Sequence, residues 1–226
     1  MYYNTFIDII SMNYDLTNFD QDLEIFKHKY LNWFHRNCVF NNKWMGRQAQ
    51  KPPLDAWIFQ EIIYDTKPSV IVEIGNYAGG STLFLANILD AIGFGKILAV
   101  DIDHSKVKDI NHKRIKWITG DATSSDVFQQ VKSEITKEDK VMIVEDSSHT
   151  YNNTLSILEL YCGLVSNGCY FIIEDGICKE DYIEGPKPGP YEAIHEFLKK
   201  HNEFRIDKNR EKFLLTYNPD GYLLKE

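Results

Sequence analysis

The sequence lacks several patterns that define common classes of protein. Its four cysteines, Cys38, Cys162, Cys169 and Cys178, form no C-x-x-C pair and no zinc-like cluster, so free thiols are expected. No run of 18 apolar residues is present, and the N-terminus shows no signal-peptide pattern. We therefore expect a cytoplasmic protein with no membrane span. The net charge of −8 argues against a nucleic-acid partner.

The chain is organised around residues 69–81, which read SVIVEIGNYAGGS. The β-branched run at its start predicts a strand buried on both faces, and the helical pattern TLFLANILDAI follows its end. Gly75 and Gly79 let the backbone bend and let a ligand approach the helix N-terminus. The pattern indicates a nucleotide-type site, although an ordinary strand-to-helix turn would look the same.

The glycine spacing departs from the G-x-G-x-x-G fingerprint of dinucleotide-binding proteins. Glu73, directly before the turn, would repel a pyrophosphate and would attract the cationic end of S-adenosylmethionine (SAM). These two features disfavour a nicotinamide oxidoreductase and favour a SAM site.

Strand-like runs alternate with helical patterns along most of the chain, and 226 residues suffice for one large domain. The alternation predicts a parallel sheet with right-handed crossovers. The last two strands have no helix between them, so one must run antiparallel. The fold class is α/β, a Rossmann-like SAM-dependent methyltransferase fold with a seven-stranded, mostly parallel sheet. The strands are expected at 70–72, 96–100, 115–118, 140–144, 170–173, 204–207 and 213–217.

Residues 1–43 are rich in Asn, Tyr, Phe and Asp and form a predicted N-terminal helical arm. An amphipathic helix is expected from about residue 20 to residue 34. Residues 44–226 form the predicted methyltransferase domain. Such arms pack on their own domain or on another subunit.

Acidic residues follow every predicted strand from the first to the fifth. Ligands of open α/β sheets bind beyond the carboxyl ends of the strands, so these acids would meet at one edge. Asp101 is expected to accept the ribose hydroxyls, and Asp121 to lie near an adenine amino group. The acids are Glu73, Asp101, Asp121, Asp146 and the pair Glu174-Asp175.

Asp146, Glu174 and Asp175 come from neighbouring strands and have no evident basic partner. Converging carboxylates raise one another's pKa, and a divalent cation relieves that repulsion. All-oxygen ligation suits Mg²⁺ better than zinc. Alternatively, these acids cap helices or pair with Lys179 and Lys187.

His149 follows Asp146 by three residues, beside the expected metal site. A neutral imidazole there could take a proton from a hydroxyl that the metal has acidified. An ordinary loop histidine is the alternative. Arg47 and Lys51 precede the first strand and could fold over the ligand, or they belong to a solvated connector.

Seven separated blocks, from Trp44 to the C-terminus, resemble in order the cephalosporin hydroxylase-like family of SAM-dependent O-methyltransferases. This family includes macrolide-sugar and rhamnosyl O-methyltransferases. The blocks are WMGRQAQKPPLDAWIFQEI, VEIGNYAGGSTLFLANILD, AVDID, EDSSHT, FIIEDGI, PGPYEAIHEFL and EKFLLTYNPDGYL. Residues 1–43 match nothing in it.

The resemblance implies a role for each matching residue. It implies a SAM loop with a ribose acid, a Mg²⁺ site, and His149 as the base that deprotonates one of two neighbouring substrate hydroxyls. One departure is the segment around Tyr77, which is expected to shape the methionine end. The implied loop and ribose residues are Glu73, Gly75, Gly79, Ser81 and Asp101, and the implied Mg²⁺ ligands are Asp146, Glu174 and Asp175.

The leading hypothesis is a Mg²⁺- and SAM-dependent O-methyltransferase acting on a sugar hydroxyl, of a nucleotide-linked or glycan sugar, or on a similar vicinal diol. The alternative is a metal-dependent oxygenase, whose non-haem iron site would require two histidines and one carboxylate as ligands. A non-enzymatic SAM-fold scaffold would have a degraded site, whereas every expected acid is present. The arm and the resemblance together predict a homo-oligomer.

Overall fold

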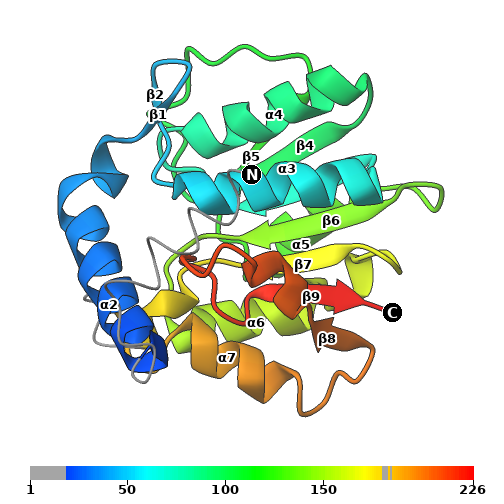
Figure 1. Ribbon diagram of the computed structural model, residues 1–226. Coiled ribbons are helices and arrows are strands. Elements are labelled where there is room, and N and C mark those ends of the chain that lie inside the picture. Colours follow the sequence, from blue (N-terminus) through cyan, green and yellow to red (C-terminus); the bar gives the residue numbers. More distant parts are fainter. Residues whose placement is uncertain (1–18, 180–182, 184) are drawn as a thin grey trace, which may run out of the picture.

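A seven-stranded sheet with helices on both faces forms the centre of the computed structural model, which describes residues 19–179, 183 and 185–226 (Figure 1). The strand order is β5-β4-β3-β6-β7-β9-β8. The predicted α/β fold with one antiparallel strand is confirmed. The strands are β3 (Val70–Ile74), β4 (Lys96–Asp101), β5 (Ile115–Thr119), β6 (Val141–Glu145), β7 (Tyr170–Ile173), β8 (Phe204–Ile206) and β9 (Tyr222–Lys225).

The central strand β3 pairs in parallel with β4 on one side and with β6 on the other. All five of its residues are buried, as expected for a strand covered on both faces. The chain runs outward from β3 to β5 and then returns to β6. This reversal makes the carboxyl ends of β3 and β6 the switch point where ligands of such sheets bind.

Two apolar cores fill the space between the sheet and its helices. Helices α3 (Pro53–Thr66) and α4 (Gly80–Ile92) cover one face and pack on residues such as Ile71 and Ile97. On the other face, α5 (Ser125–Ser133), α6 (Tyr151–Tyr161) and α7 (Pro190–Phe197) pack on the alternate residues of the same strands.

The prediction of a strand at residues 213–217 is wrong, because the structure describes these residues and has no strand there. The strand that pairs with β7 is β9, and it runs antiparallel to both β7 and β8. Buried Asp55, on α3, accepts hydrogen bonds from the Thr216 hydroxyl at 2.5 Å and from the Tyr217 backbone N–H at 2.9 Å. Because that N–H is bound to a side chain, the segment forms an anchored loop.

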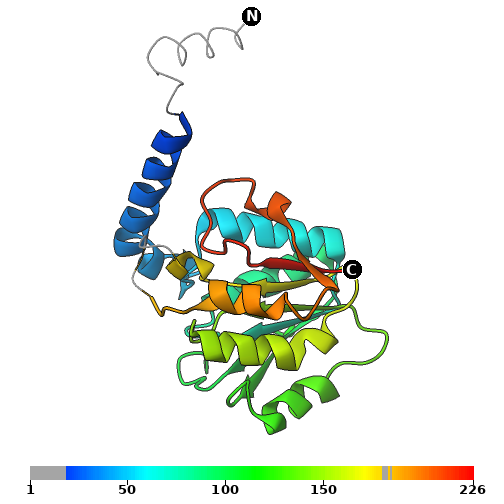
Figure 2. The same ribbon diagram turned by 90° about the horizontal axis from the view of Figure 1, so that it is seen from below.

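Helix α2 (Phe19–Asn37) forms most of the described part of the predicted arm, and residues 1–18 lie outside the described residues. Its second half packs through Leu31 and Phe34 on an apolar cluster that includes Tyr217. Its first half stands away from the domain, as Figure 2 shows. The side chains of Phe26, in that half, and of Trp33, further along the helix, are about half exposed.

Short elements complete the structure between α2 and α3. These are η2 (Val39–Asn41) and a hairpin of β1 (Lys43–Trp44) and β2 (Arg47–Gln48). Among the described residues, no helix combines the length and the apolar character needed to cross a membrane.

Candidate active site

The turn after β3 and the loop after β6 touch at Gly75. Its φ is +91°, and a Cβ atom there would lie 2.0 Å from the carbonyl oxygen of Asp146. No residue with a side chain fits that space, and the positive φ also favours glycine. The glycine turn and the first predicted metal ligand are therefore in direct backbone contact.

Glu73 lies behind this turn and is fully buried. Its carboxylate accepts hydrogen bonds from the hydroxyl of Ser81 at 2.6 Å, from the hydroxyl of Thr82, and from the Asn76 amide at 2.8 Å. Burial raises the pKa of Glu73, and the two hydroxyl donors oppose the rise. The carboxylate thus holds the turn against α4, and its predicted contact with a cofactor stays a prediction.

Asp101, at the end of β4, faces the same turn. One of its oxygens accepts the backbone N–H groups of Asn76 at 2.7 Å and Tyr77 at 3.0 Å, and the other accepts that of Asp103 at 3.1 Å. Tyr77 has a φ of +45°, and the Lys106 ammonium lies 3.6 Å from its ring centroid. Asp101 therefore shapes the loop as well as facing the space above it.

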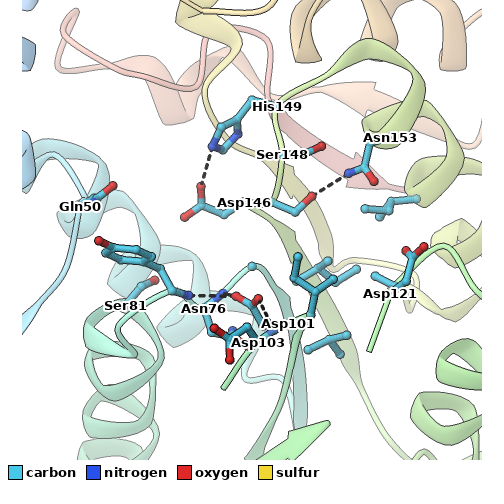
Figure 3. Close-up of a pocket in the computed structure, with 18 of the residues that line it drawn as sticks. Gln50, Asn76, Ser81, Asp101, Asp103, Asp121, Asp146, Ser148, His149 and Asn153 are labelled. Atoms are coloured by element: carbon cyan, nitrogen blue, oxygen red, sulfur yellow. Dashed lines mark hydrogen bonds and ion pairs between the residues drawn. The ribbon is translucent and has the colours of Figure 1, made fainter. Parts of the chain in front are cut away.

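A cavity of about 660 Å³ opens at this edge of the sheet (Figure 3). Asp101, beside the glycine turn, and Asp121 line its lower part in this view, with Asp121 standing apart from the other acids. Asp146 and His149 lie above them. The strand-end acids predicted from the sequence thus share one cavity, apart from Glu73 and Glu174, which lie behind its wall.

Asp146, His149 and Asp175 form a cluster at the upper end of the cavity. One potential ligand atom from each lies within 4.8 Å of the others. The Nε2 atom of His149 is 3.2 Å from an Asp175 oxygen and 3.9 Å from an Asp146 oxygen. We name these three residues the acid–histidine cluster.

Three features of the cluster indicate a functional site. His149 and Asp175 have φ values of +56° and +58°, and strained non-glycine residues of this kind gather at functional sites. The Nδ1 atom of His149 is buried and has no hydrogen-bond partner among the described residues. Two carboxylates beside one imidazole also make a donor set that suits a divalent cation with retained waters.

The absence of a basic partner for these acids, assumed from the sequence, is wrong. The Lys51 ammonium forms an ion pair with buried Glu174 and lies 3.9 Å from an Asp146 oxygen. Lys51 is itself buried, with 6% of its surface exposed. Glu174 therefore points toward Lys51, and its predicted role as a metal ligand stays a prediction.

The pKa values at this site follow from burial and crowded charge. Burial raises the pKa of Asp146 and of Glu174, and neighbouring carboxylates raise them further, whereas Lys51 lowers them. Burial alone would lower the pKa of His149, but the Asp175 and Asp146 carboxylates outweigh it and raise that pKa. The crowded carboxylates therefore favour a positive charge beside them, which a divalent cation can supply.

Two residues of this site were missed or underrated from the sequence. Lys51, before Pro52-Pro53, was expected either to fold over the ligand or to belong to a solvated connector, and its pairing with Glu174 was not predicted. Asn76 belongs to the segment around Tyr77 that departs from the family pattern, and no role of its own was predicted for it. Its amide joins Glu73 to His104, whose Nε2 lies 3.2 Å from the Asn76 oxygen.

Comparisons with known proteins show which sequences and folds this chain is similar to. The family model described as Rhamnosyl O-methyltransferase/CmcI matches residues 36–226. The rhamnosyl O-methyltransferase of Mycobacterium tuberculosis (strain ATCC 25618 / H37Rv) is 33% identical over 208 residues, covering 87% of this chain and 84% of the relative. That of Mycobacterium leprae (strain TN) is 31% identical over 206 residues, covering 88% and 90%.

Solved structures show the same fold. A structure of CmcI with Mg and SAM has a TM-score of 0.66 at 22% identity, covering 84% of this chain and 78% of that one. The O-methyltransferase TomG from Streptomyces achromogenes, in complex with SAM, has a TM-score of 0.51 at 13% identity and covers 76% of each chain. At these identities the likeness is one of fold.

Proposed function

The chain belongs to the rhamnosyl O-methyltransferase/CmcI family, and from this premise we propose that it methylates a sugar hydroxyl with the help of a divalent cation. The family resemblance seen in the sequence is confirmed, and with it the activity of a SAM-dependent O-methyltransferase. The observation that carries the proposal is the acid–histidine cluster, in the same cavity as the glycine turn.

The cavity is suited to SAM. Its volume of about 660 Å³ lies within the range of about 300–1,000 Å³ typical of small-molecule sites. In this proposal Asp101 accepts the ribose hydroxyls, and Asp121 lies toward the adenine. Gly75, Gly79, Tyr77 and Ser81 hold the methionine end, and Glu73 acts through the turn that it braces. SAM supplies the electrophilic methyl group.

Gly75→Ala should weaken SAM binding by at least about tenfold, since the new methyl group would collide with the Asp146 carbonyl and push the turn away from the loop after β6. Calorimetric titration measures the effect. Gly93→Ala is the matched control, because Gly93 has nearly the same φ of +90° but no atom within 4 Å of its missing Cβ. Equal losses in both variants would mean that backbone strain alone is responsible.

The metal proposed for this site is Mg²⁺, held by Asp146 and Asp175, with Glu174 as the third predicted carboxylate. The distances within the cluster support it, as do the pKa values of Asp146 and Glu174, which burial raises and neighbouring carboxylates raise further. A cation held by these residues would bind neighbouring substrate hydroxyls and would make one of them more acidic. The chain's part is to present oxygen ligands of fixed position and to keep this end of the cavity partly buried.

His149 is proposed as the general base, with Asp146 as its catalytic neighbour. The Nε2 atom faces the carboxylates and is the nitrogen that would receive the hydroxyl proton. A cation on Asp146 and Asp175 would offset the negative charges that raise the pKa of His149, which favours the neutral imidazole that a base requires.

The acceptor is proposed to be a sugar, of a glycan or nucleotide-linked. Neutral polar side chains that can bond hydroxyls line the cavity near the cluster, among them Gln50, Ser148 and Asn153 (Figure 3). The names of the relatives support rhamnose-bearing acceptors. A self-associating protein and a cytoplasmic location stay predictions; the exposed Phe26 and Trp33 of α2 support the first.

The test is methyl transfer from SAM to a panel of rhamnosides, nucleotide-linked sugars and catechol, followed by mass spectrometry. We expect a singly methylated sugar with Mg²⁺, loss of product with EDTA, and recovery when Mg²⁺ is restored. Methylation that is unaffected by EDTA would contradict the proposed metal dependence. A preference for catechol would contradict the proposed sugar acceptor. Metal-dependent consumption of oxygen would favour the oxygenase alternative, which the single histidine of the cluster disfavours.

A further inference from the structure

A lysine side chain already occupies the inner side of the proposed metal site. Both oxygens of Glu174 accept hydrogen bonds from the Lys51 ammonium. The same nitrogen lies 3.9 Å from one oxygen of Asp146, while His149 faces the other oxygen of that carboxylate. Lys51 therefore lies between two of the three carboxylates to which the sequence assigned a metal.

The charges explain why a cation is needed at this position. Asp146, Glu174 and Asp175 together carry three negative charges when ionised; Glu174 is buried and the other two are partly buried, so that arrangement is costly without compensation. The ammonium cancels one of them and supplies donors to Glu174. A divalent cation cancels two and accepts oxygen ligands directly. The two cations repel each other, so they cannot share the inner position.

Lys51 has a fixed backbone and lies beside a second cavity. Its backbone is fixed, because its N–H donates to the Ala49 carbonyl at 2.7 Å and its carbonyl accepts from the Asn42 amide at 3.0 Å. Its side chain also lines a second cavity of about 530 Å³, between the β1–β2 hairpin, α3 and α4. Gln60 and Asn42 are polar members of that cavity wall.

We propose that Lys51 is a positioning residue that stands in for the divalent cation when the metal is absent, and that its side chain withdraws toward the second cavity when the cation binds. The proposal rests on the metal site of the proposed function. In this arrangement Lys51 keeps Glu174 in place in the metal-free protein. The same ammonium competes with the metal and so keeps metal binding weak and reversible.

Calorimetric titration with MgCl₂ tests this directly. Lys51→Met removes the competing charge, so we expect Mg²⁺ affinity to rise by at least about fivefold. Lys51→Arg keeps the charge and should bind Mg²⁺ no more tightly than the wild type. Lys106→Met is the matched control, because Lys106 lines the cavity that holds the acid–histidine cluster but lies over Tyr77, and its removal should change the affinity by less than about twofold.

The outcomes separate this proposal from the one on which it rests. If the wild type binds Mg²⁺ clearly and Lys51→Met binds it equally or more weakly, the proposed role of Lys51 is wrong. The proposed metal site is then unaffected. Absence of Mg²⁺ binding by both chains would overturn both proposals.

A second measurement on the unaltered chain does not depend on the folding of a variant. The protein is acylated with an amine-reactive ester in EDTA and in excess Mg²⁺, and modified lysines are mapped by mass spectrometry. Labelling of Lys51 should rise severalfold with Mg²⁺, while that of exposed Lys113 stays constant as an internal reference. Labelling of Lys51 that is unchanged or lower with Mg²⁺ would overturn the proposal.

Discussion

Asp146→Ala is expected to lower turnover by about a thousandfold or more, which corresponds to about 4 kcal/mol of lost transition-state stabilisation. Asp146 occupies the middle of the site, with one oxygen toward His149 and the other toward Lys51. Its removal deletes a proposed metal ligand and the carboxylate that both neighbours face. The measurement is turnover at saturating SAM and acceptor over a range of Mg²⁺ concentrations.

Asp103→Ala is the matched control for this variant. Asp103 lines the same cavity, but it bonds Ser105 and lies outside the acid–histidine cluster. We expect its turnover to stay within about threefold of the wild type, since it removes no proposed ligand. If Asp146→Ala retained turnover comparable to that of Asp103→Ala, Asp146 would not be a ligand and the metal site would have to be sought elsewhere.

Much of the fold could be predicted from the sequence because the parallel strands carry their own signal. A strand buried on both faces, such as β3, needs a continuous β-branched run, and no other segment offers a better one. Residues 213–217 were wrongly predicted to form a strand, because the prediction relied on the same kind of apolar pattern. The apolar residues of this segment also fit a strand, and only the contact of Thr216 and Tyr217 with distant Asp55 turns it into a loop.

The candidate site was predicted in outline, because parallel strands end at one edge and so gather their terminal acids there. Which way each acid points could not be predicted. Glu73 and Glu174 turn into the protein, because Ser81, Thr82 and Lys51 offer buried donors to them. The contact of Lys51 with Glu174 joins segments that are distant along the chain, and those of Glu73 depend on how the turn after β3 folds back, so periodicity carries no information on either.

His149→Asn is expected to lower the turnover number by about a hundredfold to a thousandfold, the range typical of the loss of a general base. Asparagine suits this position because it tolerates the φ of +56° better than most residues. The variant removes the Nε2 atom that faces Asp146 and Asp175. His112→Asn serves as the control and should retain turnover, because His112 contacts Asp90 at 2.9 Å and does not line the cavity.

The dependence of this loss on Mg²⁺ distinguishes a base from a ligand, because His149 lies close enough to the two carboxylates to be either. A base acts on the substrate after the metal is bound. Mg²⁺ affinity should then stay within about threefold of the wild type, and excess Mg²⁺ should not restore turnover. A ligand contributes to metal binding itself, so its loss should lower Mg²⁺ affinity by about tenfold or more, and excess Mg²⁺ should restore turnover. Recovery at high Mg²⁺ would therefore contradict the proposed base and move His149 into the metal's coordination shell.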